Sequence, residues 1–176
     1  MDGLDEIVAL FFKNNTLLWL PLFLILSLIQ SVIILQLIWR SIGIILPIKK
    51  TIIPSIILLT FIWVARMTIA VPFHMFVSTA FAILIVIIYN KVDIFHAAVG
   101  VLFAHTVIII GSILIIEPIL FIAADNKHAF FFSDLFGYSI GVILETILPL
   151  LVLMIFINKN FVLVKSPLRN LKNHES

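Results

Sequence analysis

Five stretches of this chain are almost continuously apolar for about 20 residues, the length that crosses the hydrocarbon core of a bilayer as an α-helix. In lipid, the backbone must satisfy its own hydrogen bonds, and these runs lack the alternating pattern of barrel strands. The sequence therefore predicts an all-α, polytopic integral membrane bundle of about five transmembrane helices. The predicted spans cover residues 16–38, 51–69, 71–89, 94–116 and 136–157.

Composition supports the same class of protein. Hydrophobic residues make up 63% of the 176 residues and charged residues 11%, whereas soluble domains are about 45–50% apolar and about 25% charged. The excess apolar side chains must face lipid. We expect one transmembrane helical domain over residues 1–158 and a basic cytoplasmic tail over residues 159–176. A sixth span would arise if residues 4–12 also cross the membrane.

Several kinds of chemistry are excluded by what the sequence lacks. The chain has no cysteine, which rules out disulfides, zinc–thiolate sites, iron–sulfur clusters and a cysteine nucleophile. No phosphate-binding loop, metalloprotease motif or nucleophile elbow is present. We therefore expect no enzyme activity, cofactor or metal site. The net charge of +2 does not suggest nucleic acid, and the acidic N-terminus is unlike a cleavable signal peptide.

The distribution of basic residues predicts the orientation. With five spans, the N-terminus and the loops after the second and fourth spans share one side, which carries Lys13, Arg66 and Lys127. The positive-inside rule places this poorer side outside and the C-terminus in the cytoplasm of a multi-pass cell-membrane protein. The other eight of the eleven basic residues are Arg40, Lys49, Lys50, Lys91, Lys159, Lys165, Arg169 and Lys172.

Three polar residues near the outer ends of the spans are candidates for ligand binding. Arg66 and His74 flank the short link between the second and third spans, so they should lie at similar depth. Glu117 ends the fourth span on the same side and is the natural partner of Arg66. The alternative is that Arg66 only reaches the lipid headgroups, that His74 is an interfacial group and that Glu117 is solvated. His74 could also titrate near neutral pH.

Two more candidates lie inside the predicted spans. His105 is about eleven residues into the fourth span, and Glu145 is about nine residues into the fifth, roughly 13 Å deep at 1.5 Å per residue. An intramembrane carboxylate is a functional hypothesis by default. We expect His105 to be its partner, with Arg66 as second choice. The alternative is a neutral Glu145 that is hydrogen-bonded to backbone.

Other polar and small residues in the spans favour packing roles. Polar side chains expected to hydrogen-bond between helices are Gln30, Gln36, Ser78 and Thr79. Small residues spaced for close helix contact within the monomer are Gly100 with Ala104, and Gly137 with Gly141.

A family resemblance covers roughly residues 49–160. A basic pair precedes the second span, Arg66 ends that span, "VPFHMF" opens the next, and "NKVDIFHAAVGVLFAHTVIIIGSILIIEPIL" follows. The last span then runs into "FINKN". This arrangement resembles the membrane-embedded sensor region of accessory-gene-regulator-type histidine kinases and their stand-alone relatives in Gram-positive, clostridia-like bacteria. The most specific pieces are Arg66, "PFH" at 72–74 and "EP" at 117–118.

The resemblance implies a non-enzymatic sensor that detects an extracellular peptide or an envelope ligand and acts on a signalling protein or kinase partner. The sequence departs from the family after the last span. It ends at Ser176 with no phosphoacceptor motif or ATP-binding segment, and His174 lies in a polar tail. We expect either a truncated sensor region or a stand-alone relative. The alternative is a substrate-binding membrane component of a small-molecule transporter, with His105 and Glu145 lining its cavity.

Overall fold

Five long helices make up most of the computed structural model, which describes residues 16–70, 73–118 and 135–165. All five are long and apolar enough to cross a membrane, and these ranges contain no strand. The prediction of an all-α polytopic membrane bundle is thus confirmed. The helices are α2 (Thr16–Ser41), α3 (Ile48–Thr68), α4 (Phe73–Asn90), α5 (Ile94–Gly111), which continues as the π-helix η1 (Ser112–Ile116), and α8 (Leu135–Lys159).

The helix ends lie within three residues of the predicted spans. Most helices run past the apolar stretch because backbone hydrogen bonding does not stop where side chains become polar. One consequence is that Pro54 lies in the second turn of α3, which begins at Ile48. The further span considered for residues 4–12, the loop 119–134 and the tail after residue 165 lie outside the described residues.

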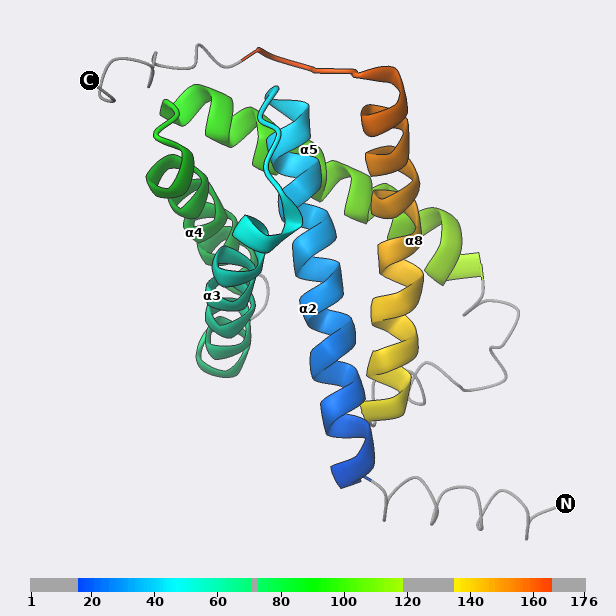
Figure 1. Cartoon of the computed structure of the whole chain (residues 1–176). Coiled ribbons are helices and arrows are strands. Elements are labelled where there is room, and N and C mark those ends of the chain that lie inside the picture. The colour runs from blue at the N-terminus through cyan, green and yellow to red at the C-terminus, as the bar shows by residue number, and fades with distance from the viewer. Residues whose placement is uncertain (1–15, 71–72, 119–134, 166–176) are drawn as a thin grey trace, which may run out of the picture.

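The arrangement places α2 at the centre (Figure 1). α8 runs beside α2 in the same direction, α5 crosses both of them, and α3 and α4 form an antiparallel hairpin on the other side of α2. Of the apolar window of α2, 44% is buried, against 17–28% for the other four spans. α2 is therefore the most buried helix, and it packs against α3, α5 and α8, while α4 packs against α3 and α5.

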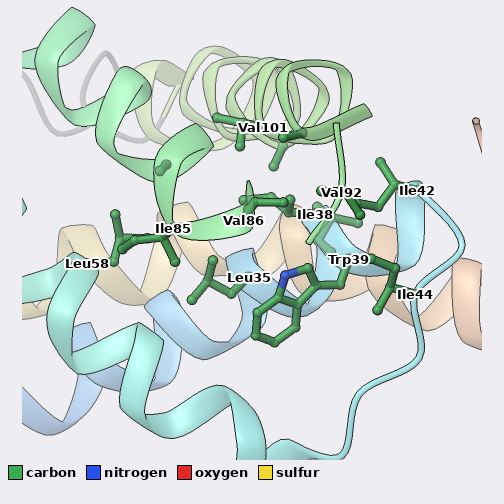
Figure 2. Close-up of a cluster of buried hydrophobic side chains, with 14 of the residues drawn as sticks. Leu35, Ile38, Trp39, Ile42, Ile44, Leu58, Ile85, Val86, Val92 and Val101 are labelled. Carbon is green, nitrogen blue, oxygen red and sulfur yellow. The ribbon is translucent and has the colours of Figure 1, made fainter. Parts of the chain in front are cut away.

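The core gathers at the second half of α2 (Figure 2). Leu35, Ile38 and Trp39 have no exposed surface, and the side chains of Leu58 in α3 and Val86 in α4 belong to the same cluster. A helix that is buried on every side is typical of the centre of a bundle. The outer faces instead expose large apolar side chains, as expected for contact with lipid; examples are Ile53, Phe76, Leu102, Leu114 and Ile155.

Small residues set the closest helix contacts. A Cβ added to Gly100 of α5 would lie 3.0 Å from the carbonyl oxygen of Ile38 and 3.0 Å from Cγ2 of Ile42. Ala104, one turn later, is fully buried, so the predicted Gly100–Ala104 contact is confirmed. Gly141 of α8 behaves differently, because a Cβ there would meet nothing within 4 Å. It makes no close contact, and the surroundings of its predicted partner, Gly137, lie outside the described side chains.

The start of α5 has a side-chain cap. Asp93 is the N-cap residue, and its Oδ1 accepts a hydrogen bond of 3.1 Å from the backbone N–H of His96. Oδ2 of Asp93 pairs with Nδ1 of His96. The backbone hydrogen bond from His96, with a smaller contribution from its ring, lowers the pKa of Asp93 below the ordinary 3.8. The charged carboxylate therefore stabilises this helix end.

The close contact at Gly100 predicts that Gly100→Ala lowers the melting temperature of the purified protein in detergent. Overpacking of this kind costs about 1–3 kcal/mol, since the added methyl must push against backbone and a buried Ile side chain. Gly141→Ala is the matched control, and its melting temperature should be unchanged or higher because alanine is the better helix former. Equal loss in both variants would contradict the close approach of α5 to α2.

The cap predicts a pH dependence. Because folding lowers the pKa of Asp93, its stabilisation is fully present above pH 3.8 and is lost as pH falls through the folded-state pKa below that value. Asp93→Asn keeps a capping oxygen without the charge. The difference in melting temperature between the wild type and Asp93→Asn should shrink below about pH 4. A difference that stays constant from pH 3 to pH 7 would contradict a stabilising carboxylate.

Candidate functional site

The intramembrane carboxylate of Glu145 hydrogen-bonds across the α2–α8 contact. Nε2 of Gln30 donates to Oε2 of Glu145 over 3.2 Å, and both side chains are partly buried. The predicted partner, His105, makes other contacts: its Nδ1 lies 3.0 Å from the carbonyl oxygen of Val101, and its Nε2 lies 3.4 Å from Oγ1 of Thr79. The difference arises because α8 lies along α2, while His105 faces α4.

Two further polar contacts join helices. Nε2 of Gln36 donates to Oγ1 of Thr51 over 2.5 Å and to the carbonyl oxygen of Leu46 over 3.1 Å, which ties α2 to the start of α3. Together with the Thr79 contact to α5, these bonds confirm the predicted interhelical roles of Gln30, Gln36 and Thr79. Ser78 is buried, but its hydroxyl has no hydrogen-bond partner among the described residues.

Pro149 interrupts α8 one turn after Glu145. Its side chain is fully buried. Since proline has no backbone N–H, the carbonyl of Glu145 loses its usual i+4 helix partner. Glu145 thus sits at a weak point of its helix. Pro149 was visible in the sequence within the fifth span, but its position relative to Glu145 was not used in the prediction.

The facing part of α5 is also irregular. The π-helix η1 (Ser112–Ile116) contacts α8, and a Cβ at Gly111 would lie 3.1 Å from Cβ of Leu148. π-helical turns are uncommon and often occur at functional sites. Residue composition does not distinguish π-helical turns from α-helix, so the sequence did not predict η1.

Arg66, His74 and Glu117 do not form one cluster. Arg66 lies exposed in the last turn of α3, and His74, which is half-buried, lies in the first turn of α4, so they flank the turn as predicted. Glu117 is exposed and follows η1. Figure 1 shows the end of α3 and the end of η1 on opposite sides of the α2–α8 pair. The crossing of α5 carries Glu117 away from Arg66, and neither makes an ion pair with another described residue.

The chain after α8 attaches to the end of α2. The backbone N–H groups of Leu163 and Val164 both donate to the carbonyl oxygen of Ser41, over 2.8 and 3.2 Å. The N–H of Phe161 donates to the carbonyl of Phe156 over 3.2 Å, and the two rings contact edge to face with centroids 5.1 Å apart. The described part of the predicted tail is therefore bound to the bundle.

Within residues 16–70, 73–118 and 135–165, no three His, Asp or Glu side chains lie close enough together to hold a metal ion. What the described polar residues offer is hydrogen bonding between helices at membrane depth.

The Gln30–Glu145 contact predicts measurable coupling between the two positions. A double-mutant cycle with Gln30→Leu, Glu145→Leu and the double variant, followed by steric trapping in bicelles, should give an interaction free energy of about 0.6 kcal/mol and up to about 1.7 kcal/mol. Glu145 with Thr106 provides the control pair, because Thr106 is exposed and donates only to Leu102 of its own helix. Equal coupling in the two cycles would contradict the hydrogen bond between α2 and α8.

No protein-family model matches this sequence, and no curated protein and no solved structure matches it either. The resemblance to sensor kinases stays a hypothesis that rests on short motifs. The length and hydropathy of the five helices show a multi-pass helical membrane protein.

Proposed function

We propose that the protein is a non-enzymatic membrane sensor or signalling module. The observation that carries this proposal is the Gln30–Glu145 hydrogen bond between two helices that run in the same direction. One of these helices, α8, leads directly into a segment that is bonded to the end of the other at Ser41. A change inside the membrane therefore has a continuous path to the end of the bundle.

The proposed switch has two states of α8 relative to α2. With the hydrogen bond made, Glu145 is held against α2. When a ligand breaks it, α8 can shift at Pro149, where a backbone hydrogen bond is already missing. Phe156 lies about 17 Å along the helix from Glu145, at 1.5 Å per residue, and contacts Phe161 in the docked segment. A shift of α8 would thus loosen the bonds to Ser41.

The opposite end of the bundle offers a place for the stimulus. Nδ1 of His74 and Oγ of Ser78, one turn apart on α4, are buried without a hydrogen-bond partner among the described residues. Buried polar atoms are normally satisfied, so a polar group of a peptide or envelope ligand could bind there. In this proposal His74 binds the ligand and Arg66 lies beside it. Glu117 does not belong to this site. A signalling protein or kinase would receive the change through the residues after α8.

A second candidate is the substrate-binding component of a small-molecule transporter. It is favoured by the irregular backbone of two neighbouring helices, the π-helix η1 in α5 and Pro149 in α8, which lie at a common contact. Interrupted helices often form the binding sites of transporters. The sensor proposal is preferred because it also accounts for the docked segment after α8.

If the protein is a sensor, a signalling protein should co-purify with it, and the amount captured should depend on the Gln30–Glu145 contact. The tagged protein would be cross-linked in its native membranes, solubilised and analysed by mass spectrometry for proteins and small molecules. We expect a signalling protein to be enriched, and its yield to fall severalfold in Glu145→Ala and Gln30→Ala. Thr106→Ala is the control and should capture as much as the wild type, because its hydroxyl bonds only within α5.

Two outcomes would overturn the proposal. An ATPase subunit captured together with a bound metabolite would favour the transporter. Equal capture of a signalling protein by all variants would show that the Gln30–Glu145 contact plays no part in signalling.

A further inference from the structure

A small cavity lies where α2 and α8 end. Its volume is about 70 Å³, several times the roughly 10–15 Å³ that holds one water molecule. The end of α2, the turn after it and the segment after α8 form its walls, which are mainly apolar. Its polar side chains are Arg40 and Asn160, and its apolar walls include Ile45, Phe156 and Phe161.

Two unusual backbone turns shape this cavity. Gly43 has φ +80° and Asn160 has φ 50°, both in the left-handed region, so the chain turns away from the helix axis after α2 and after α8. A side chain at Gly43 would come within 3.2 Å of Cγ1 of Val162. The cavity is therefore built by specific local conformations and by the bonds from Leu163 and Val164 to Ser41.

Arg40 is the charged group of the cavity, and it has no counter-ion there. Its side chain is half-buried, its Nε is fully buried, and that Nε has no hydrogen-bond partner among the described residues. No described carboxylate forms an ion pair with it. The buried Nε–H is therefore an unpaired donor, and the planar fork of a guanidinium matches phosphate oxygens in a bidentate geometry.

The surroundings of the cavity favour an anion. The helix ends and connections at this end of the bundle carry Lys49, Lys50, Lys91, Lys159 and Lys165 as well as Arg40. Among the described residues at this end, the acidic side chain is Asp93, which is already paired with His96. The local field therefore attracts negative charge with little competition.

From this geometry we infer a binding site for the phosphodiester headgroup of an anionic phospholipid, with Arg40 as its phosphate ligand and Asn160 as a second hydrogen-bond donor. The apolar walls suit the glycerol and the first acyl carbons, and the site lies at a membrane end of the bundle, where such headgroups are found. A free phosphate ion would match Arg40 but not the apolar walls. The inference is independent of the proposed signalling role.

The test is native mass spectrometry of the full-length protein, titrated in detergent with phosphatidylglycerol, cardiolipin or phosphatidylcholine. We expect one tightly bound anionic lipid per chain and weak binding of phosphatidylcholine. Arg40→Ala should weaken binding of the anionic lipid about tenfold or more. Lys49→Ala is the matched control, since it removes an exposed charge from the same end, and it should change the affinity by less than about twofold.

A second variant keeps the test decisive if Arg40→Ala does not fold. Ile45 is 69% exposed and lines the cavity, so Ile45→Trp should fill it without changing any charge, and the bound lipid should be lost. Equal weakening by Arg40→Ala and Lys49→Ala would overturn the site in favour of diffuse charge attraction. Retention of the lipid by Ile45→Trp, or equal binding of phosphatidylcholine, would also overturn it. Displacement of the lipid by millimolar inorganic phosphate would assign the site to the free ion instead.

Discussion

The packing of α5 and α8 against α2 is the contact on which the rest of the structure depends. At Gly100 the backbone of α5 approaches α2 so closely that a methyl group would not fit without movement. In a membrane, helices gain little from the hydrophobic effect, so close packing and interhelical hydrogen bonds must hold them together. The Gln30–Glu145 bond adds a directional contact between α2 and α8. Because α2 also bonds to α3 through Gln36 and Thr51, a shift at this centre would reach most of the bundle.

Polar groups inside the bundle have distinct roles. Gln36 and Thr51 are buried and bonded to each other, which suits a fixed joint. Glu145 is only partly buried and sits one turn before a proline. These features suit a contact between Glu145 and Gln30 that breaks and re-forms in the proposed switch. The segment bonded to Ser41 and the cavity around Arg40 lie beyond this contact along α8, so a switch in the membrane and a lipid at its end would act on the same short piece of chain.

The sequence predicted the number, order and approximate ends of the helices because apolar length decides whether a segment can span lipid. It also predicted the helix contacts of Gln30, Gln36 and Thr79, since a polar side chain in a span needs a partner. It could not predict which partner each residue meets. The separation of Arg66 from Glu117 depends on how α5 crosses the other helices, and the choice of Gln30 for Glu145 depends on the rotation of α8 (Figure 1). The π-helix arises from tertiary packing and left no pattern in the sequence.

In the proposed switch, the Gln30–Glu145 contact is coupled to the segment docked at Ser41, and one distance measurement tests this coupling directly. The chain has no cysteine, so spin labels can be placed at Ile48→Cys and Leu163→Cys alone and their separation measured by pulsed electron resonance in lipid nanodiscs. We expect a narrow distance distribution in the otherwise unchanged protein and a broader or longer one when Glu145→Ala or Gln30→Ala is added, with no change for Thr106→Ala. Identical distributions in all four proteins would contradict the coupling.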